Sequence, residues 1–184
     1  MIVTGGEFKG RKIVCPAGND VRPTSSKTRQ AIFNVLYSMG IDVQDATVLE
    51  LFSGTGVMSF EAISRGAKRA TLVDNSHNAL ACSQKNIEHL KIIDKVKVVK
   101  QDAIEYLNYA NLDNVDLLYI DPPYRYEKYD ELLKVLFSKV NSDALVMLES
   151  KYSVIDENNQ INASIIKTKS WGKAFVTFMK KANG

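Results

Sequence analysis

Histidine and cysteine are scarce in this chain, which has two of each among its 184 residues. Cys15 and Cys82 lie in unrelated contexts and lack the C-x-x-C spacing of zinc and redox sites. His77 and His89 have no acidic or cysteine partner at the spacing of metal ligands. The sequence therefore predicts neither a disulfide framework nor a metal site.

Long hydrophobic runs are also missing. No apolar stretch approaches the ~20 residues that a membrane-spanning helix requires. The first residues, MIVTGGEFKGRK, lack the apolar region of a signal peptide. Hydrophobic side chains still make up 45% of the chain, which is enough for a substantial core. We therefore expect a globular, cytoplasmic protein without membrane contact. A monomer is the expected oligomeric state, although nothing in the composition decides it.

An excess of positive charge is confined to the first part of the chain. Residues 1–40 contain six Lys or Arg and two Asp or Glu, a net charge of +4; the whole chain carries +3, so residues 41–184 carry −1. A basic patch beside a catalytic domain is what binding to a phosphate backbone requires. A solvated basic face explains the charge equally well, so charge alone leaves both interpretations open.

From residue 46 onward, short β-rich runs alternate with helical periodicity. Five such alternations predict a doubly wound α/β fold with a mostly parallel sheet and helices on both faces. Only Trp171 and Gly172 separate the last two strands, which predicts an antiparallel hairpin. The expected strands are 46–52, 69–74, 95–101, 115–120, 144–149, 163–170 and 173–180, and the expected helices are 56–65, 76–90, 103–109 and 128–138.

The residues before this sheet are predicted to form an N-terminal extension, residues 1–40, beside a main domain, residues 41–184. The glycine-punctuated segment IVTGGEFKGRKIVCP resembles a small β-hairpin. The segment SSKTRQAIFNVLYSM predicts a helix, because its apolar residues recur at helical spacing. This apolar face consists of Ala31, Ile32, Val35, Leu36 and Met39.

Polar residues recur where the predicted parallel strands end. The first strand runs into ELFSGTGVMSF, where Gly54 and Gly56 allow a tight turn ahead of a helix N-terminus. Asp74, Asp102 and Asp121 end the next three strands. Because ligands bind outside the carboxyl ends of parallel strands, this pattern predicts a nucleotide-like ligand. A dinucleotide is disfavoured, because the third glycine of G-x-G-x-x-G is absent.

The fourth strand runs into the segment LLYIDPPYRY. Two consecutive prolines donate no backbone hydrogen bond, so Ile120 is about the last residue that can lie in the sheet. Asp121 and Tyr124 are thereby placed at the ligand-binding edge. For an Asp-Pro pair alone, a rigid turn without a catalytic role is the alternative interpretation.

Several of these segments resemble motifs of the class I S-adenosylmethionine-dependent methyltransferases: LELFSGTGVMSFEAISRGA, LVDNS, KQDA and IDPPY. Together with GGEFKGRKI and VRPTSSKTRQAIFNVL, they resemble the RsmD-type bacterial small-subunit ribosomal RNA guanine-N2 methyltransferases over essentially the whole chain. The resemblance implies a Rossmann-like methyltransferase fold with a seven-stranded sheet, and S-adenosylmethionine as cofactor. It also implies 16S ribosomal RNA or the small ribosomal subunit as partner, with guanine-966 as the family's target.

The cofactor is expected along the ends of the first three strands. The carboxylate of Asp74 can bind the two ribose hydroxyls, and Asp102 can face the adenine. Glu50 stands where the family commonly has aspartate, which keeps the charge and lengthens the reach. The expected cofactor-binding residues are Glu50, Phe52, Ser53, Gly54, Thr55, Gly56, Asp74, Asn75, Asp102 and Ala103, and no metal is expected.

The expected catalytic residues are Asp121, Pro122, Pro123 and Tyr124. The N2 atom of guanine is a poor nucleophile because its lone pair is delocalised into the ring. Asp121 and the carbonyl of Pro122 can accept hydrogen bonds from its two N–H groups and leave the lone pair aimed at the methyl donor. Tyr124 can stack on the base and fix its plane.

Basic residues near the N-terminus are expected to hold the RNA backbone while the target base, unpaired or flipped, enters the site. The expected RNA-binding residues are Lys9, Arg11, Arg22, Thr24, Lys27 and Arg29, with Lys12 extending the track. For the hydroxyls of Thr24 to Ser26, capping of the following helix is the alternative role.

Two other functions compete with this interpretation. A DNA adenine-N6 methyltransferase would use the same D-P-P-Y geometry, but the compact chain shows no obvious DNA-recognition domain. A non-catalytic ribosomal RNA-binding assembly factor would not need both an intact cofactor turn and an intact D-P-P-Y segment.

Overall fold

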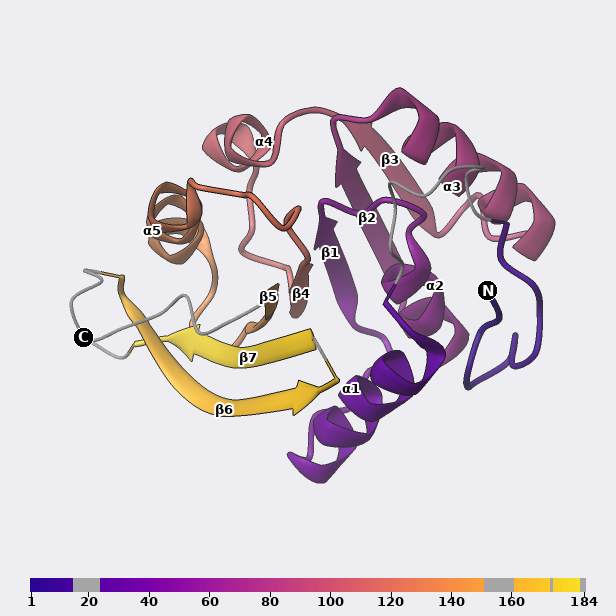
Figure 1. The fold of residues 1–184 in the computed structure, drawn as a ribbon, viewed down its shortest axis with the longest axis horizontal. Coiled ribbons are helices and arrows are strands. Elements are labelled where there is room, and N and C mark those ends of the chain that lie inside the picture. The colour runs from indigo at the N-terminus through magenta and orange to yellow at the C-terminus, as the bar shows by residue number, and fades with distance from the viewer. Residues whose placement is uncertain (15–23, 151–160, 173, 183–184) are drawn as a thin grey trace.

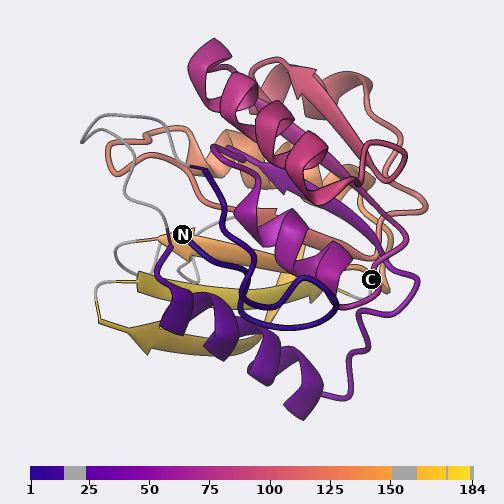
Figure 2. The ribbon, with the colours of Figure 1, turned by 90° about the vertical axis from the view of Figure 1, so that its right-hand side faces the viewer.

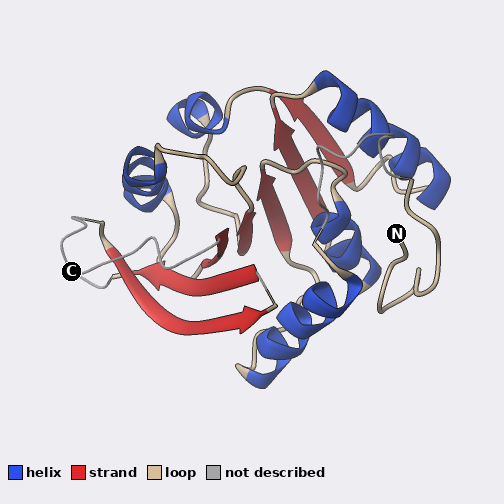
Figure 3. Ribbon diagram, in the orientation of Figure 1, coloured by secondary structure: helices blue, strands red, loops and turns tan. Residues whose placement is uncertain are grey.

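The structure is a computed structural model that describes residues 1–14, 24–150, 161–172 and 174–182. One seven-stranded sheet lies between two layers of helices (Figure 1 and Figure 3). The helices are α1 (Ser26–Ser38), α2 (Val57–Ser64), α3 (His77–Leu90), α4 (Ala103–Tyr109) and α5 (Tyr129–Lys139). The strands are β1 (Thr47–Leu51), β2 (Arg69–Asp74), β3 (Val96–Lys100), β4 (Leu117–Ile120), β5 (Leu145–Ser150), β6 (Ala163–Trp171) and β7 (Ala174–Lys181).

The strands follow the order β3-β2-β1-β4-β5-β7-β6. Strands β1 to β5 run parallel, whereas β7 is antiparallel to both β5 and β6. The chain winds outward from β1 to β3 and then returns to the middle of the sheet, where β4 pairs with β1. The predicted fold, a mostly parallel seven-stranded sheet with an antiparallel C-terminal hairpin, is confirmed.

Helices cover both faces of the sheet, which explains why its central strands are mostly apolar, with Glu50 of β1 as a buried exception. Helices α1, α2 and α3 lie on one face, and α4 and α5 lie on the other (Figure 1). Val48 and Tyr119 belong to the core on the first face, whereas Leu49 and Leu118 belong to the core on the second. Among the described helices, none is long and apolar enough to cross a membrane.

Helix α1 begins at a side-chain cap. The hydroxyl oxygen of Ser25 accepts a hydrogen bond from the backbone N–H of Thr28 at 3.1 Å, which satisfies one of the free donors of the first turn. The capping role considered for this segment is therefore confirmed for Ser25. In the predicted apolar face, the buried residues are Ile32, Val35 and Leu36, and the half-buried ones are Ala31 and Met39.

Residues 1–14 form a loop that docks on the end of α2. The predicted hairpin is present as a single antiparallel bridge between Ile2 and Lys12. The backbone N–H of Glu7 donates to the carbonyl of Ser64 at 2.7 Å. At Gly6, where φ is +74°, a Cβ would lie 1.7 Å from that same oxygen, so only glycine allows this approach. Figure 2 shows this indigo segment running beside α2.

Candidate active site at the carboxyl ends of β1 and β4

The sheet has its topological switch point between β1 and β4. Strand β1 continues into α2 on one face, and β4 continues into α5 on the other (Figure 1). Leu51 is in register with both Val73 and Ile120, so the carboxyl ends of β1, β2 and β4 are level. Phe52 and Asp121 follow these ends directly. The predicted site residues therefore gather at the edge where ligands of such sheets bind.

The turn after β1 uses two glycines for different purposes. Gly54 and Gly56 have φ values of +53° and +76°. A Cβ at Gly56 would lie 2.6 Å from the side chain of Leu72, so this glycine permits packing inside the protein. A Cβ at Gly54 would meet no atom of the described residues within 4 Å. Only Gly54 therefore faces open space at the strand ends, where a ligand can approach the backbone.

Asp74 holds this turn against β2. Its carboxylate accepts hydrogen bonds from the backbone N–H groups of Gly54 and Ser76, each at 2.8 Å. Asp102 caps helix α4, because its Oδ1 accepts from two backbone N–H groups of the first turn at 2.8 and 3.2 Å. Both carboxylates lie at the predicted strand ends, and each oxygen can accept more than one donor.

The remaining cofactor candidates differ in exposure. Thr55 and Ala103 are buried, whereas Asn75 is exposed. Ser53 is buried too, and its hydroxyl has no hydrogen-bond partner among the described residues. An unsatisfied buried hydroxyl is costly, so Ser53 favours a polar ligand atom beside the turn.

Glu50 is a buried acid just below the turn. Its side chain is 3% exposed, and the backbone N–H of Ser59 donates to its Oε2 at 2.8 Å. Burial raises the pKa of Glu50 from 4.5 to about 7, and the nearby charge of Asp74 adds to the effect. A cation at this site would stabilise the carboxylate form, so Glu50 favours a positively charged ligand.

Asp121 occupies the predicted place at the end of β4. Burial raises the pKa of its carboxyl well above the usual value, and the charges of Glu149 and Glu50 raise it further. In the loop that follows, Pro122 is buried and Tyr124 is 56% exposed. The loop thus presents a carboxyl and an accessible aromatic ring at the same edge.

An aromatic contact joins the two loops of the site. The rings of Phe52 and Tyr126 meet edge to face with centroids 5.0 Å apart, and Tyr129 lies 5.3 Å from Tyr126 on its other side. Phe52 has a φ of 54°, a left-handed conformation that is rare for an aromatic residue. The turn after β1 and the loop after β4 are therefore packed together as one unit.

Three polar residues beside Asp121 were not predicted as catalytic. The hydroxyl of Tyr119 donates a hydrogen bond to Oε2 of Glu149. Thr24 Oγ1 lies 3.4 Å from both of these oxygens. Glu149 comes near the end of β5, just as Asp121 follows β4. Applying the strand-end argument to the fifth strand would have found it.

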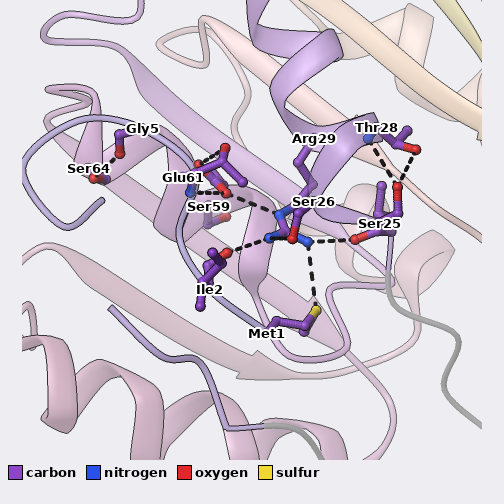
Figure 4. Close-up of polar contacts among 12 residues, drawn as sticks. Met1, Ile2, Gly5, Ser25, Ser26, Thr28, Arg29, Ser59, Glu61 and Ser64 are labelled. Atoms are coloured by element: carbon purple, nitrogen blue, oxygen red, sulfur yellow. Dashed lines mark hydrogen bonds and ion pairs between the residues drawn. The ribbon is translucent and has the colours of Figure 1, made fainter. Parts of the chain in front are cut away.

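Arg29 and Thr24 correct the prediction of an RNA-binding surface. The Arg29 side chain is fully buried: its Nε donates to Oε1 of Glu61 at 3.1 Å, and a terminal nitrogen donates to the carbonyl of Ile2 at 2.5 Å (Figure 4). The prediction that Arg29 contacts an RNA phosphate is therefore wrong. Thr24 is buried as well and faces β4 and β5. Arg22 lies outside the described residues.

The other predicted RNA-binding residues lie on the surface. Lys9, Arg11, Lys12 and Lys27 are all exposed. The guanidinium of Arg11 lies over the ring of Phe8, 5.0 Å from its centroid, which restricts its position.

Two curated relatives match this chain over most of its length. Ribosomal RNA small subunit methyltransferase D of Escherichia coli (strain K12) is 28% identical over 187 residues, which cover 99% of this chain and 91% of that protein. The protein of the same name from Buchnera aphidicola subsp. Acyrthosiphon pisum is 29% identical, covering 85% of this chain and 82% of that protein. The resemblance to RsmD-type methyltransferases is thereby confirmed.

Solved structures and a family model extend the comparison. The protein yhhF from Escherichia coli superposes with a TM-score of 0.84 at 27% identity, covering 99% of this chain and 98% of that one. A hypothetical protein of Thermus thermophilus shares the fold, with a TM-score of 0.75 at 21% identity over 97% of this chain and 98% of that one. The family model described as Conserved hypothetical protein 95 matches residues 1–180. The chain belongs to the Conserved hypothetical protein 95 family.

Proposed function

We propose that this protein transfers a methyl group from S-adenosylmethionine to the exocyclic N2 of a guanine in small-subunit ribosomal RNA. One observation carries the proposal: Asp121 and the Gly54 turn lie level at the ends of two neighbouring strands. This arrangement supports the proposal, because an acceptor for an amino group and a site for a nucleotide-like methyl donor would then be neighbours. The relatives named as ribosomal RNA small subunit methyltransferase D support the choice of RNA.

The residues at the strand ends fit S-adenosylmethionine. Gly54 leaves room for a ligand against the backbone, and Ser53 offers an unsatisfied hydroxyl. In this proposal Asp74, at the end of β2, binds the ribose hydroxyls. Glu50 favours a cation, which suits the amino and sulfonium groups of this molecule. The protein SMU.776, which shares the fold with a TM-score of 0.70 at 18% identity over 88% of this chain and 50% of that one, was crystallised in complex with S-adenosylhomocysteine. When bound, the cofactor supplies an electrophilic methyl group.

In the proposed reaction, the loop after β4 binds and orients the target base. The ionised carboxylate of Asp121 accepts a hydrogen bond from one N–H of the amino group, and the carbonyl of Pro122 accepts a hydrogen bond from the other. This directs the nitrogen lone pair toward the methyl donor. Tyr124 is exposed enough to stack on the base. The contribution of these residues is orientation, which in favourable systems is worth about 7–11 kcal/mol.

We propose that basic residues near the N-terminus hold the RNA beside this site. Guanine N2 takes part in Watson–Crick pairing, so an unpaired or flipped nucleotide must enter. Lys9, Arg11, Lys12 and Lys27 are exposed and can bind phosphates.

The protein is expected to act in the cytoplasm, where ribosomal RNA is assembled into subunits. Sedimentation analysis would test the expected monomer.

Radiolabelled methyl transfer tests the proposal directly. The purified protein should label 16S ribosomal RNA or small subunits, and nuclease digestion should yield N2-methylguanine. Label recovered as N6-methyladenine from duplex DNA would instead identify the alternative DNA enzyme. Binding of ribosomal RNA without any label in RNA or DNA would favour the assembly factor. Asp121→Ala is the control for a contaminating methyltransferase, because it should label far less.

A further inference from the structure

We propose that Glu149, held by Tyr119 and Thr24, is a positioning residue that sets the charge state of Asp121. This inference rests on the proposed function, because it concerns the carboxyl that receives the target amino group. It assigns a role to the side chains of Glu149, Tyr119 and Thr24, which the proposed binding of cofactor and base does not use.

Strand register brings the two carboxyls together. The last paired residues of β4 and β5 are Ile120 and Leu148, so Asp121 and Glu149 come next at equivalent positions of neighbouring parallel strands. Such strands lie about 4.8 Å apart. Equivalent positions point to the same face of the sheet, and Tyr119 shares that face because it lies two residues before Asp121. This is the face covered by α1, which Thr24 precedes.

Hydrogen bonds hold Glu149 in place. The Tyr119 hydroxyl donates to its Oε2, and Thr24 Oγ1 donates to the same oxygen at 3.4 Å. Tyr119 is 2% exposed, and burial raises the pKa of its phenol well above 10, so the hydroxyl stays a donor at neutral pH. Burial raises the pKa of Glu149, whereas these two donors lower it and favour the ionised form.

The groups around Asp121 are acidic or neutral on every described element that packs there. They are Glu50 from β1, Tyr119 from β4, Glu149 from β5 and Thr24 before α1. Two neighbouring carboxyls in a partly buried site resist double ionisation, so they hold one proton between them. The pKa of both carboxyls is raised by burial, but two hydrogen bonds, from Tyr119 and Thr24, lower that of Glu149, whereas only Thr24 lowers that of Asp121. The shared proton is therefore expected on Asp121 in the free protein. Asp121 becomes an acceptor only when it loses that proton.

The charge of Glu149 therefore controls the pH at which Asp121 can work. Glu149→Gln removes the charge but keeps an amide oxygen for the Tyr119 hydroxyl. Asp121 should then ionise more easily, and the acid limb of the pH–rate profile should move down by about one pH unit. A purely structural role for Glu149 would lower the rate or the stability without moving this limb.

The test uses single-turnover methyl transfer to RNA by the full chain between pH 5 and 9, at saturating cofactor. The matched control is Glu88→Gln, the same change at an exposed position of α3. A downward shift in Glu149→Gln alone supports the proposal. If the acid limbs of the pH–rate profiles superimpose for wild type and both variants, the proposal is overturned.

A second measurement separates this proposal from the proposed function. Carbon-13 NMR titration of the Asp and Glu carboxyls needs no substrate, and the Asp121 midpoint should fall in Glu149→Gln relative to Glu88→Gln. If wild type labels no nucleic acid yet the Asp121 midpoint shifts, the proposed function fails and the coupling stands. An unchanged midpoint in the folded variant overturns the coupling whatever the activity.

Discussion

Arg29 and Glu61 form a buried ion pair, with Nε of the guanidinium 3.1 Å from Oε1 of the carboxylate and neither side chain exposed (Figure 4). Glu61 also accepts from the backbone N–H of Thr4 at 2.8 Å and from its hydroxyl at 2.9 Å, and it pairs with Arg65. One carboxylate on α2 therefore fastens both the N-terminal loop and α1. Since α2 begins at the Gly56 turn, the N-terminal extension is anchored to the helix that follows the proposed cofactor-binding turn.

Loss of this pair should destabilise the whole protein. Arg29→Ala removes one of the two cationic partners of the buried Glu61 carboxylate and leaves Arg65, so the cost should be at most about 3–5 kcal/mol. Lys27→Ala, on an exposed position of the same helix, should change stability by less than about 0.5 kcal/mol. Urea denaturation measures both, and equal stabilities for the two variants would contradict the anchoring role.

The two glycines of the turn after β1 should respond differently to substitution. Gly54→Ala adds a methyl group toward open space, so it should lower S-adenosylmethionine affinity while destabilising the fold by only about 1–2 kcal/mol for the left-handed backbone. Gly56→Ala drives a methyl group into Leu72, so it should cost more stability. Calorimetric titration with the cofactor and urea denaturation distinguish the two. Unchanged affinity in Gly54→Ala would remove Gly54 from the ligand site.

Asp121 should be needed for turnover and dispensable for cofactor binding. Asp121→Ala removes one of two acceptors for the amino group, and single-turnover methyl transfer should fall about 10²–10³-fold. Asp121→Asn should be milder, since the amide oxygen still accepts a hydrogen bond. An equally large loss in Asp121→Asn would mean that the charge of the carboxylate matters as well. Wild-type rates in folded Asp121→Ala would exclude the residue from the mechanism.

Stability of the ligand-free protein should fall as the pH rises from 4.5 to about 7. Over that range the unfolded chain releases the Glu50 proton, whereas the folded protein retains it because its pKa is about 7. The contribution of Glu50 is fully present below pH 4.5 and is lost by about pH 7, at most about 3 kcal/mol. Glu50→Gln should lose less stability between pH 5 and 8 than wild type or Glu88→Gln. Equal losses in all three would refute the assignment.

The exposed lysines should act through salt-dependent RNA binding. Replacing Lys9 and Lys27 together by Ala should lower the slope of log affinity against log salt by ~0.7–0.9 for each lost phosphate contact. Lys134→Ala, exposed on α5 across the sheet, serves as the control and should keep the wild-type slope. If the double variant also keeps that slope, these lysines form a solvated face.

The sheet and the ends of its strands were predictable because their signals are local. Pro122 and Pro123 stop β4, and the glycines after β1 open a turn, whatever the rest of the chain does. The contact between Phe52 and Tyr126 was not predictable, because it joins loops that approach each other only after β4 has inserted beside β1.

The burial of Arg29 was missed for a related reason. Its partner Glu61 lies 32 residues further along the chain, and nothing in KTRQAI distinguishes an arginine that pairs inside the protein from one that meets RNA. Charged residues are mostly exposed, so the surface was the sound expectation. Only the packing of α1 across α2 decides the case.

The place of β7 in the sheet has a consequence for synthesis on the ribosome. Strand β6 leaves the ribosome before β7, yet β7 lies between β5 and β6 and pairs with both. Until β7 emerges, β6 has no neighbour in its native register, and β5 exposes an open edge. Phe178 and Met179, fully buried on opposite faces of the finished sheet, arrive with that late strand. Nascent chains halted before residue 174 should therefore expose an unpaired strand edge of β5 and bind chaperones.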